Sequence, residues 1–256
     1  MVGNVEYMLK KRLEEEKGLH FLLLDPQKQN DVGTIARYAE KSGTSAILVG
    51  GSTAILTSEY DQVIEQIKIN SNLPVIIFPS NLPSITNKAD AIFFMSLMNS
   101  INPYFITGAQ ALGVGVIRKY KLEAIPLAYI IVGDGGAAGF VGQAQCIPIE
   151  HPELAAGYAM AAEMFGFRLA YLEAGSGAQK ALSPAFVSEV RKCISIPLIV
   201  GGGIRTESQA EDLAAAGADI LVTGTIIEKS CEYDKIAKLV VAIRRGARNR
   251  TILSKS

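Results

Sequence analysis

Two acidic residues follow apolar runs of this sequence, at points where a carboxylate can do chemistry. Asp25 comes directly after the apolar segment 21–24, and Glu173 ends the segment 168–173. Glu173 could accept hydrogen bonds from substrate hydroxyls or act as a base, and Tyr171 could donate or accept another such bond. A purely structural role is an alternative for each residue. Asp25 could simply cap the turn that follows it, and Tyr171 could simply fill the core.

A magnesium ion is the ligand that Asp25 suits best. One carboxylate, a hydroxyl, waters and substrate phosphate oxygens together make a reasonable Mg²⁺ shell. Ser52 follows the next apolar run and Gly50-Gly51, and it is the candidate for the hydroxyl. Asp25 and Ser52 are therefore predicted as the metal-binding pair, although serine also simply suits a turn.

Three glycine-rich segments offer backbone N–H groups with little bulk around them. They read GSG at 175–177, GGGIR at 201–205 and TGT at 223–225. The last two each close an apolar run and are separated by one helical segment, so they can form a phosphate cradle from two successive loops. In a (β/α)₈ barrel such a site is usual after strands 7 and 8. The other interpretation is that these glycines serve only tight turns.

Short apolar runs alternate with helical segments along the whole chain, and this pattern implies parallel strands with helical crossovers. The strands are expected at 20–24, 45–49, 73–78, 91–94, 126–132, 168–173, 196–200 and 218–222. Eight such units in about 250 residues favour a closed (β/α)₈ TIM barrel over an open sheet. With no linker in view, residues 1–256 are predicted to be one domain. A long glycine-rich loop is expected at 133–149, and a helix at 102–119.

Composition excludes several classes of function. The 25 basic and 25 acidic side chains cancel, so no basic field points to nucleic acid. The three cysteines are scattered, which argues against a disulfide framework or a zinc site. The charged N-terminal segment does not resemble a signal peptide, and no apolar run approaches the ~20 residues that span a bilayer. We expect a cytoplasmic protein.

The two sides of the expected barrel mouth differ in polarity. FPSNLPS at 78–84 and FFMSLMNSINPYF at 93–105 place aromatic and aliphatic side chains near strands 3 to 5, opposite the glycine loops. Much of this is barrel core. A polar, phosphate-binding side facing an apolar side nevertheless suits a substrate with a long hydrocarbon.

Several motifs are similar to those of the geranylgeranylglyceryl phosphate synthase family, which includes the bacterial heptaprenylglyceryl phosphate synthases. They are LLLDPQK at 22–28, ILVGGST at 47–53, PVIIFPSN at 74–81, FFMSLMNS at 93–100, YLEAGSGA at 171–178, GGGIR at 201–205 and TGT at 223–225. The chain length and the segment at 133–145 resemble the archaeal type. That segment has Gly133-Asp134 and Phe140 where the family pattern has Glu-Pro and Trp.

The resemblance implies a reaction and a set of site residues. The reaction joins sn-glycerol 1-phosphate to geranylgeranyl diphosphate, releases diphosphate and forms the first ether bond of archaeal membrane lipids. Asp25 and Ser52 match the Mg²⁺ positions, with Glu173 and Tyr171 as the catalytic candidates. The substrate-binding positions are Tyr171, Leu172, Glu173, Ala174, Gly175, Ser176, Gly177, Gly202, Gly203, Gly224 and Thr225. The resemblance also implies a homo-oligomer, with a transient membrane contact when the lipid product leaves.

Two alternatives remain at this point. A barrel isomerase or aldolase acting on a sugar phosphate would use the same glycine loops. It would need an acid–base pair or a Schiff-base lysine at strand ends, where Glu173 and Asp25 form the one available pair. A non-catalytic phosphate-binding barrel is the other alternative, and loss of activity in a folded Glu173→Ala variant would argue against it. The prenyl chain length could also differ from geranylgeranyl.

Overall fold

The computed structural model describes residues 2–28, 31–51, 56–175, 177–224 and 233–250. Eight parallel strands close in chain order into a barrel, β1 next to β2 and so on round to β8 beside β1. They are β1 Leu19–Leu24, β2 Ala46–Val49, β3 Val75–Ile77, β4 Ala91–Leu97, β5 Glu123–Ile131, β6 Leu169–Glu173, β7 Leu198–Gly201 and β8 Ile220–Thr223. The prediction of a TIM barrel is confirmed.

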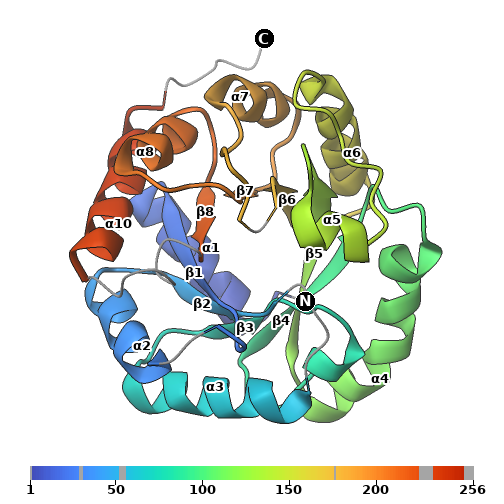
Figure 1. The fold of residues 1–256 in the computed structure, drawn as a ribbon, viewed down its shortest axis with the longest axis vertical. Helices are drawn as coiled ribbons and strands as arrows, with labels where there is room; N and C mark the ends of the chain where they lie inside the picture. Colours follow the sequence, from blue (N-terminus) through green and yellow to red (C-terminus); the bar gives the residue numbers. More distant parts are fainter. Residues whose placement is uncertain (1, 29–30, 52–55, 176, 225–232, 251–256) are drawn as a thin grey trace.

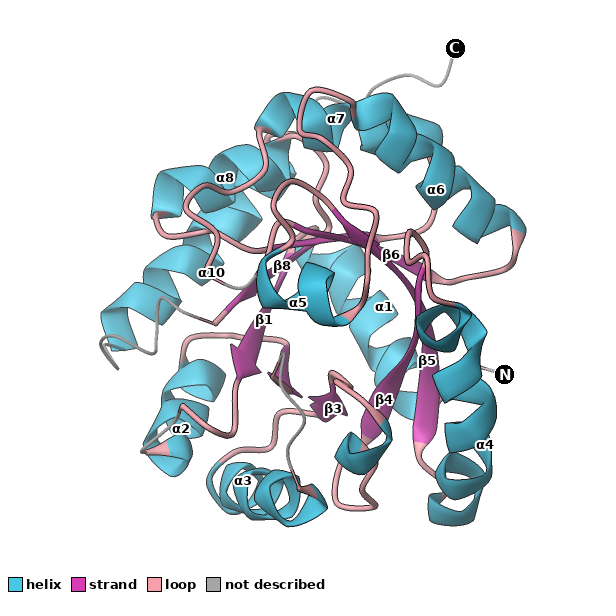
Figure 2. Cartoon of the chain, turned by 45° about the vertical axis from the view of Figure 1, so that its right-hand side comes forward, coloured by secondary structure: helices cyan, strands magenta, loops and turns pink. Residues whose placement is uncertain are grey.

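Helices surround the strands, as Figures 1 and 2 show. They are α1 Asn4–Glu16, α2 Val32–Lys41, α3 Thr57–Asn70, α4 Ala109–Tyr120, α5 Gly136–Val141, α6 Pro152–Met164, α7 Pro184–Cys193, α8 Glu207–Ala215 and α10 Tyr233–Arg248, with the short turns η1 Leu82–Ser84 and η2 Tyr104–Gly108. Among the described residues, none of the helices combines the length and the apolar character needed to cross a membrane.

Side chains alternate between the inside and the outside of the barrel along each strand. Phe21, Phe93 and Tyr171 belong to a cluster that fills the interior. Leu22 and Leu172, one residue away from such positions, pack instead in clusters that include residues of the surrounding helices. Because both faces of every strand are covered, the strands read as continuous apolar runs rather than alternating ones.

Helix α1 lies across the end of the barrel where the strands begin, behind the strands in Figure 1. The Glu123 carboxylate, at the first residue of β5, accepts hydrogen bonds of 2.8 Å from the backbone N–H groups of Val5 and Glu6. Arg168, just before β6, donates two hydrogen bonds of 2.7 and 2.8 Å to the Glu6 carboxylate, which is 3% exposed. This closed end leaves the carboxyl ends of the strands as the open mouth.

The segment expected as a loop at 133–149 contains helix α5, which Figure 2 shows over the barrel mouth. The turn that follows β4 holds the C-terminal end of α5, because the Ser100 hydroxyl donates to the Gly142 carbonyl at 2.6 Å and the Asn99 amide donates to the Gln145 carbonyl at 2.9 Å. These tertiary contacts stabilise a helix of glycine and alanine that local sequence does not indicate. The helix expected at 102–119 is instead the wider π-helical turn η2 followed by α4.

Candidate active site

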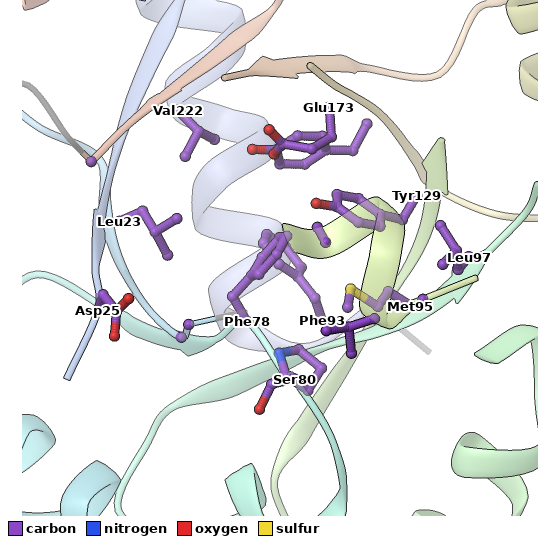
Figure 3. Close-up of a pocket in the computed structure, with 18 of the residues that line it drawn as sticks. Leu23, Asp25, Phe78, Ser80, Phe93, Met95, Leu97, Tyr129, Glu173 and Val222 are labelled. Atoms are coloured by element: carbon purple, nitrogen blue, oxygen red, sulfur yellow. The ribbon is translucent and has the colours of Figure 1, made fainter. Parts of the chain in front are cut away.

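One pocket opens at the carboxyl ends of the strands and has a polar and an apolar side. Asp25, Glu173 and the backbone of Gly202 and Gly224 line the polar side. Figure 3 shows Phe78, Phe93, Met95 and Leu97 grouped below Glu173 and Tyr129, with Asp25 away from them at the left. The apolar side continues between β4 and α4, where the lining residues are Leu82, Ile85, Ile92, Phe94, Gly113 and Ile117. The predicted contrast between the two sides is therefore present.

Glu173 is the buried acid of this pocket, with 6% of its surface exposed. Its Oε1 atom accepts a hydrogen bond of 2.7 Å from the Gly175 backbone N–H. Burial raises the pKa of the Glu173 carboxyl above its ordinary value, and hydrogen bonds from Gly175, Tyr171 and Tyr129 oppose that rise. A buried carboxylate of raised pKa can anchor a substrate hydroxyl and accept its proton.

Two tyrosines present their hydroxyl groups to Glu173. Tyr129 of β5 and Tyr171 of β6 are paired in register, and their ring centroids lie 5.2 Å apart. Burial, followed by the negative charge of Glu173, raises the pKa of both phenols well above the ordinary value. Both tyrosines are therefore neutral hydrogen-bond donors over the working pH range. Tyr171 fills the barrel interior and also contacts Glu173, so the two roles considered for it coexist.

Sequence reasoning missed Tyr129. It lies inside the run expected to form β5, and no turn or glycine motif marks it. The available signal was alternation, because Leu127, Tyr129 and Ile131 all face the interior. Counting inward positions on β5 against those of β6 would have placed Tyr129 beside Tyr171.

The glycine loops after β6 and β7 pack directly on each other. Gly202 has a φ of +88°, and a Cβ atom there would lie 2.7 Å from Glu173 Oε1 and 2.9 Å from Gly175 N. A Cβ at Gly203 would lie 2.5 Å from the Lys180 carbonyl. Both positions therefore exclude side chains, and backbone N–H groups can approach a bound anion closely.

The predicted site residues fall into four groups. Gly175 is not among the residues that line the pocket, and its N–H donates to Glu173. Asp25, Tyr171, Glu173, Gly177, Gly202, Gly203 and Gly224 line the pocket. Leu172 and Ala174 point outward into the cluster between strands and helices, so they can reach a ligand only through their backbone. Ser52, Ser176 and Thr225 lie outside the described residues.

Asp25 is held by local contacts at the end of β1. Its Oδ1 atom accepts a hydrogen bond of 3.1 Å from the Gln27 N–H, and its Oδ2 atom lies 3.1 Å from Lys28 Nζ. A Cβ added to Gly51 would lie 2.8 Å from Asp25 Oδ1, so the β2 loop passes close to the carboxylate. Among the described residues no group of three His, Cys, Asp or Glu side chains forms a metal site. The Asp25 carboxylate is one hard oxygen donor of the kind that Mg²⁺ takes, and the binding of that ion at this place stays a prediction.

The chain is similar to known proteins over nearly its whole length. The model of the PcrB family matches residues 11–243. The geranylgeranylglyceryl phosphate synthase of Pyrococcus abyssi is 50% identical over 247 residues, which are 96% of this chain and 98% of the relative. The corresponding enzyme of Thermococcus kodakarensis is 49% identical over 249 residues, with the same two shares.

A solved structure extends the likeness to three dimensions. The crystal structure of (S)-3-O-geranylgeranylglyceryl phosphate synthase from Thermoplasma acidophilum, in complex with its substrate sn-glycerol-1-phosphate, aligns with a TM-score of 0.88 and 42% identity. The alignment covers 95% of this chain and 99% of that one. By sequence and by fold, this chain belongs to the PcrB family, in company with the geranylgeranylglyceryl phosphate synthases that it matches over nearly its whole length.

Proposed function

We propose that this protein is a Mg²⁺-dependent prenyltransferase that joins sn-glycerol 1-phosphate to geranylgeranyl diphosphate. The observation that carries the proposal is one continuous pocket, which runs from glycine loops suited to a phosphate to an apolar groove between β4 and α4. The 50% and 49% sequence identity to two geranylgeranylglyceryl phosphate synthases supports the same reaction.

Glycerol 1-phosphate would bind on the polar side of the pocket. The backbone of Gly177, Gly202 and Gly224 surrounds a space that suits the phosphate, in the position usual for barrels of this kind. Glu173 lies beside Gly202 and would accept a hydrogen bond from a glycerol hydroxyl. With both ends of a small substrate held, one hydroxyl is presented in a fixed direction.

The prenyl chain would occupy the apolar side. Phe78 packs edge-to-face on Phe93 and Tyr129, with ring centroids 6.0 and 5.4 Å apart, and these rings form the wall nearest the polar side. The groove beyond them continues past Phe94 and Ile117 toward α4. Such a wall keeps water from an allylic carbon that acquires positive charge.

The diphosphate would lie near the end of β1. Asp25, with Ser52 and substrate oxygens, would hold the Mg²⁺ ion, which neutralises the diphosphate when bound. The Lys28 ammonium group lines the pocket beside Asp25 and can contribute a further positive charge. The leaving group therefore departs at the rim, away from Glu173.

The proposed step balances in atoms and electrons. The glycerol hydroxyl oxygen bonds to C1 of the prenyl chain as the bond from C1 to the diphosphate oxygen breaks. The hydroxyl proton passes toward Glu173, whose raised pKa favours its acceptance. Tyr129 and Tyr171 donate hydrogen bonds that keep the carboxylate in position.

One assay tests the proposal directly. Prenyl diphosphates of several lengths are incubated with each enantiomer of glycerol phosphate, with Mg²⁺ and with chelator. We expect ether product only with sn-glycerol 1-phosphate, best with the geranylgeranyl chain and only with Mg²⁺. Absence of ether product in every combination would refute the proposed function.

The Asp25→Asn variant tests the metal assignment. We expect a strong loss of turnover with little change in unfolding, because the side chain keeps its size while losing its charge. Unchanged Mg²⁺-dependent activity in this variant would show that Asp25 does not hold the ion.

Two further features are part of the proposal. The product is an amphiphile, so we infer that a cytoplasmic enzyme contacts a membrane transiently on release, which a vesicle extraction assay measures. Met164 and Phe165 are adjacent, large and exposed apolar side chains at the end of α6, and they suit a contact in a homo-oligomer. Sedimentation of the purified chain tests that inference.

A further inference from the structure

Arg205 ends the GGGIR segment and lies between two loops of the pocket. Its Nη1 atom donates to the Gln179 carbonyl at 2.5 Å, and its Nη2 atom donates to the Ala178 carbonyl at 2.8 Å. Both acceptors belong to the segment after β6, whereas Arg205 follows β7. The guanidinium thus bridges two loops with two charge-assisted hydrogen bonds.

The backbone of Arg205 is fixed independently of its side chain. The Arg205 and Thr206 N–H groups donate to the Gln209 side-chain oxygen at 2.9 and 3.2 Å, and the Thr206 hydroxyl accepts from the Gln209 N–H at 3.2 Å. This capping box joins Arg205 to the first turn of α8. The side chain therefore extends from a rigid base.

The segment that Arg205 grips crosses directly over the β7 loop. A Cβ at Gly203 would lie 2.5 Å from the Lys180 carbonyl and 2.6 Å from the Ala181 N atom. Gly177 and Ala178, at the start of the same segment, line the pocket beside Gly202 and Gly203. One wall of the phosphate cradle thus depends on how closely this segment lies on the β7 loop.

We propose that Arg205 is a positioning residue that clamps the backbone at Ala178 and Gln179 onto the β7 loop and so keeps the phosphate cradle in its binding geometry. The ligand class is a phosphomonoester such as sn-glycerol 1-phosphate, and this part rests on the proposed function. Arg205 itself lines the pocket, but both of its Nη atoms donate to backbone carbonyls, so it acts through the backbone of its neighbours and leaves the phosphate to the N–H groups of the loops.

The experiment compares Arg205→Ala, Arg205→Lys and the control Arg248→Ala, which removes an exposed arginine on α10. Amide hydrogen exchange of residues 177–182 is measured without ligand. Binding of sn-glycerol 1-phosphate is measured by calorimetry, and KM is determined for each substrate.

For Arg205→Ala we expect faster exchange in residues 177–182 and a Kd for sn-glycerol 1-phosphate raised about tenfold, the factor that ~1.4 kcal/mol represents. The KM for the prenyl diphosphate and the kcat should change little, because the hydrogen bonds of the Arg205 side chain go to the Ala178 and Gln179 carbonyls rather than to the apolar side or Glu173. A lysine keeps the positive charge but lacks the planar guanidinium group that donates two hydrogen bonds. Arg205→Lys should therefore bind sn-glycerol 1-phosphate more tightly than Arg205→Ala but less tightly than the wild type. The control should match the wild type.

Two results would overturn the clamp. Weaker ligand binding with unchanged exchange in residues 177–182 would make Arg205 a direct phosphate ligand. Unchanged binding in Arg205→Ala would remove its role in the cradle. Failure of the wild type to bind sn-glycerol 1-phosphate would instead count against the proposed function, while the exchange measurement would still test whether Arg205 holds the segment.

Discussion

Replacement of Gly201 by alanine is the sharpest test of the packing around Tyr171. Gly201 is the last residue of β7 and pairs in register with Glu173. A Cβ at this position would lie 2.0 Å from the Tyr171 hydroxyl oxygen, 2.8 Å from Cζ and 3.1 Å from Cε1. Ordinary contact begins near 3.4 Å, so the phenol must retreat by 1.4 Å, the difference between 3.4 and 2.0 Å.

The ring has little room for that retreat. Tyr171 is 1% exposed, and its centroid lies 5.7 Å from Phe78 and 5.2 Å from Tyr129. Overpacking of a filled core costs about 1–3 kcal/mol, which is the loss of unfolding free energy that we expect. At this chain length each kcal/mol of lost unfolding free energy lowers Tm by roughly 2–4 °C. The hydrogen bond from Tyr171 to Glu173 should also be disturbed, so kcat should fall with stability.

The assay is urea unfolding of Gly201→Ala, Tyr171→Phe and the double variant. Removing the hydroxyl takes away the shortest contact but leaves the one to Cζ, so the double variant should be more stable than additivity predicts without full recovery. Gly115→Ala is the matched control, because a Cβ there meets nothing within 4 Å and alanine favours a helix by about 1 kcal/mol. Additive effects, or a Gly201→Ala variant as stable as the wild type, would refute this account.

Three further predictions concern other parts of the molecule. Because burial raises the pKa of Glu173, the decrease of kcat/KM on the acid side of the pH profile should have an apparent pKa above the ordinary value of a glutamate. The Glu173→Gln variant should have lower activity and should lack this decrease. Burial lowers the pKa of His20 to about 3, so its neutral form contributes stability above its ordinary pKa that is lost as pH falls from 6.5 toward 3. In urea unfolding, the free energy of unfolding at pH 5 should be about 2 kcal/mol lower than at pH 7 because of this group. The His20→Gln variant should not show this difference. A Cβ at Gly113 would lie 3.0 Å from Ile85, so Gly113→Leu should reduce kcat/KM for long prenyl diphosphates more than for short ones, whereas Gly115→Leu should not.

The barrel and the polar half of the site could be predicted because both follow from chain order. Parallel strands bring their carboxyl ends to one end of the barrel. Asp25, Glu173 and the glycine segments therefore lie at the same mouth, independently of how the helices pack. The apolar runs were long enough to locate every strand to within a few residues, as the predicted 168–173 and the observed Leu169–Glu173 show.

The parts that sequence did not predict depend on contacts between distant segments. Helix α5 is held by Asn99 and Ser100 more than thirty residues earlier. Tyr129 acquires its role only from register with Tyr171, and Arg205 acquires its partners only because the β6 loop crosses the β7 loop. The Mg²⁺ assignment of Asp25 and Ser52 stays a prediction.

The apolar wall and the strength of the buried acid have one physical cause. The rings of Phe78 and Tyr129 exclude water from the barrel interior, and the same exclusion raises the pKa of Glu173. On the proposed function, a prenyl chain lying on that wall removes further water from the carboxylate and raises its pKa again. The prenyl substrate would then make Glu173 a stronger base for the hydroxyl of glycerol 1-phosphate. Proton acceptance would accordingly be favoured most when both substrates are present, and ether formation would be coupled to full occupancy of the pocket.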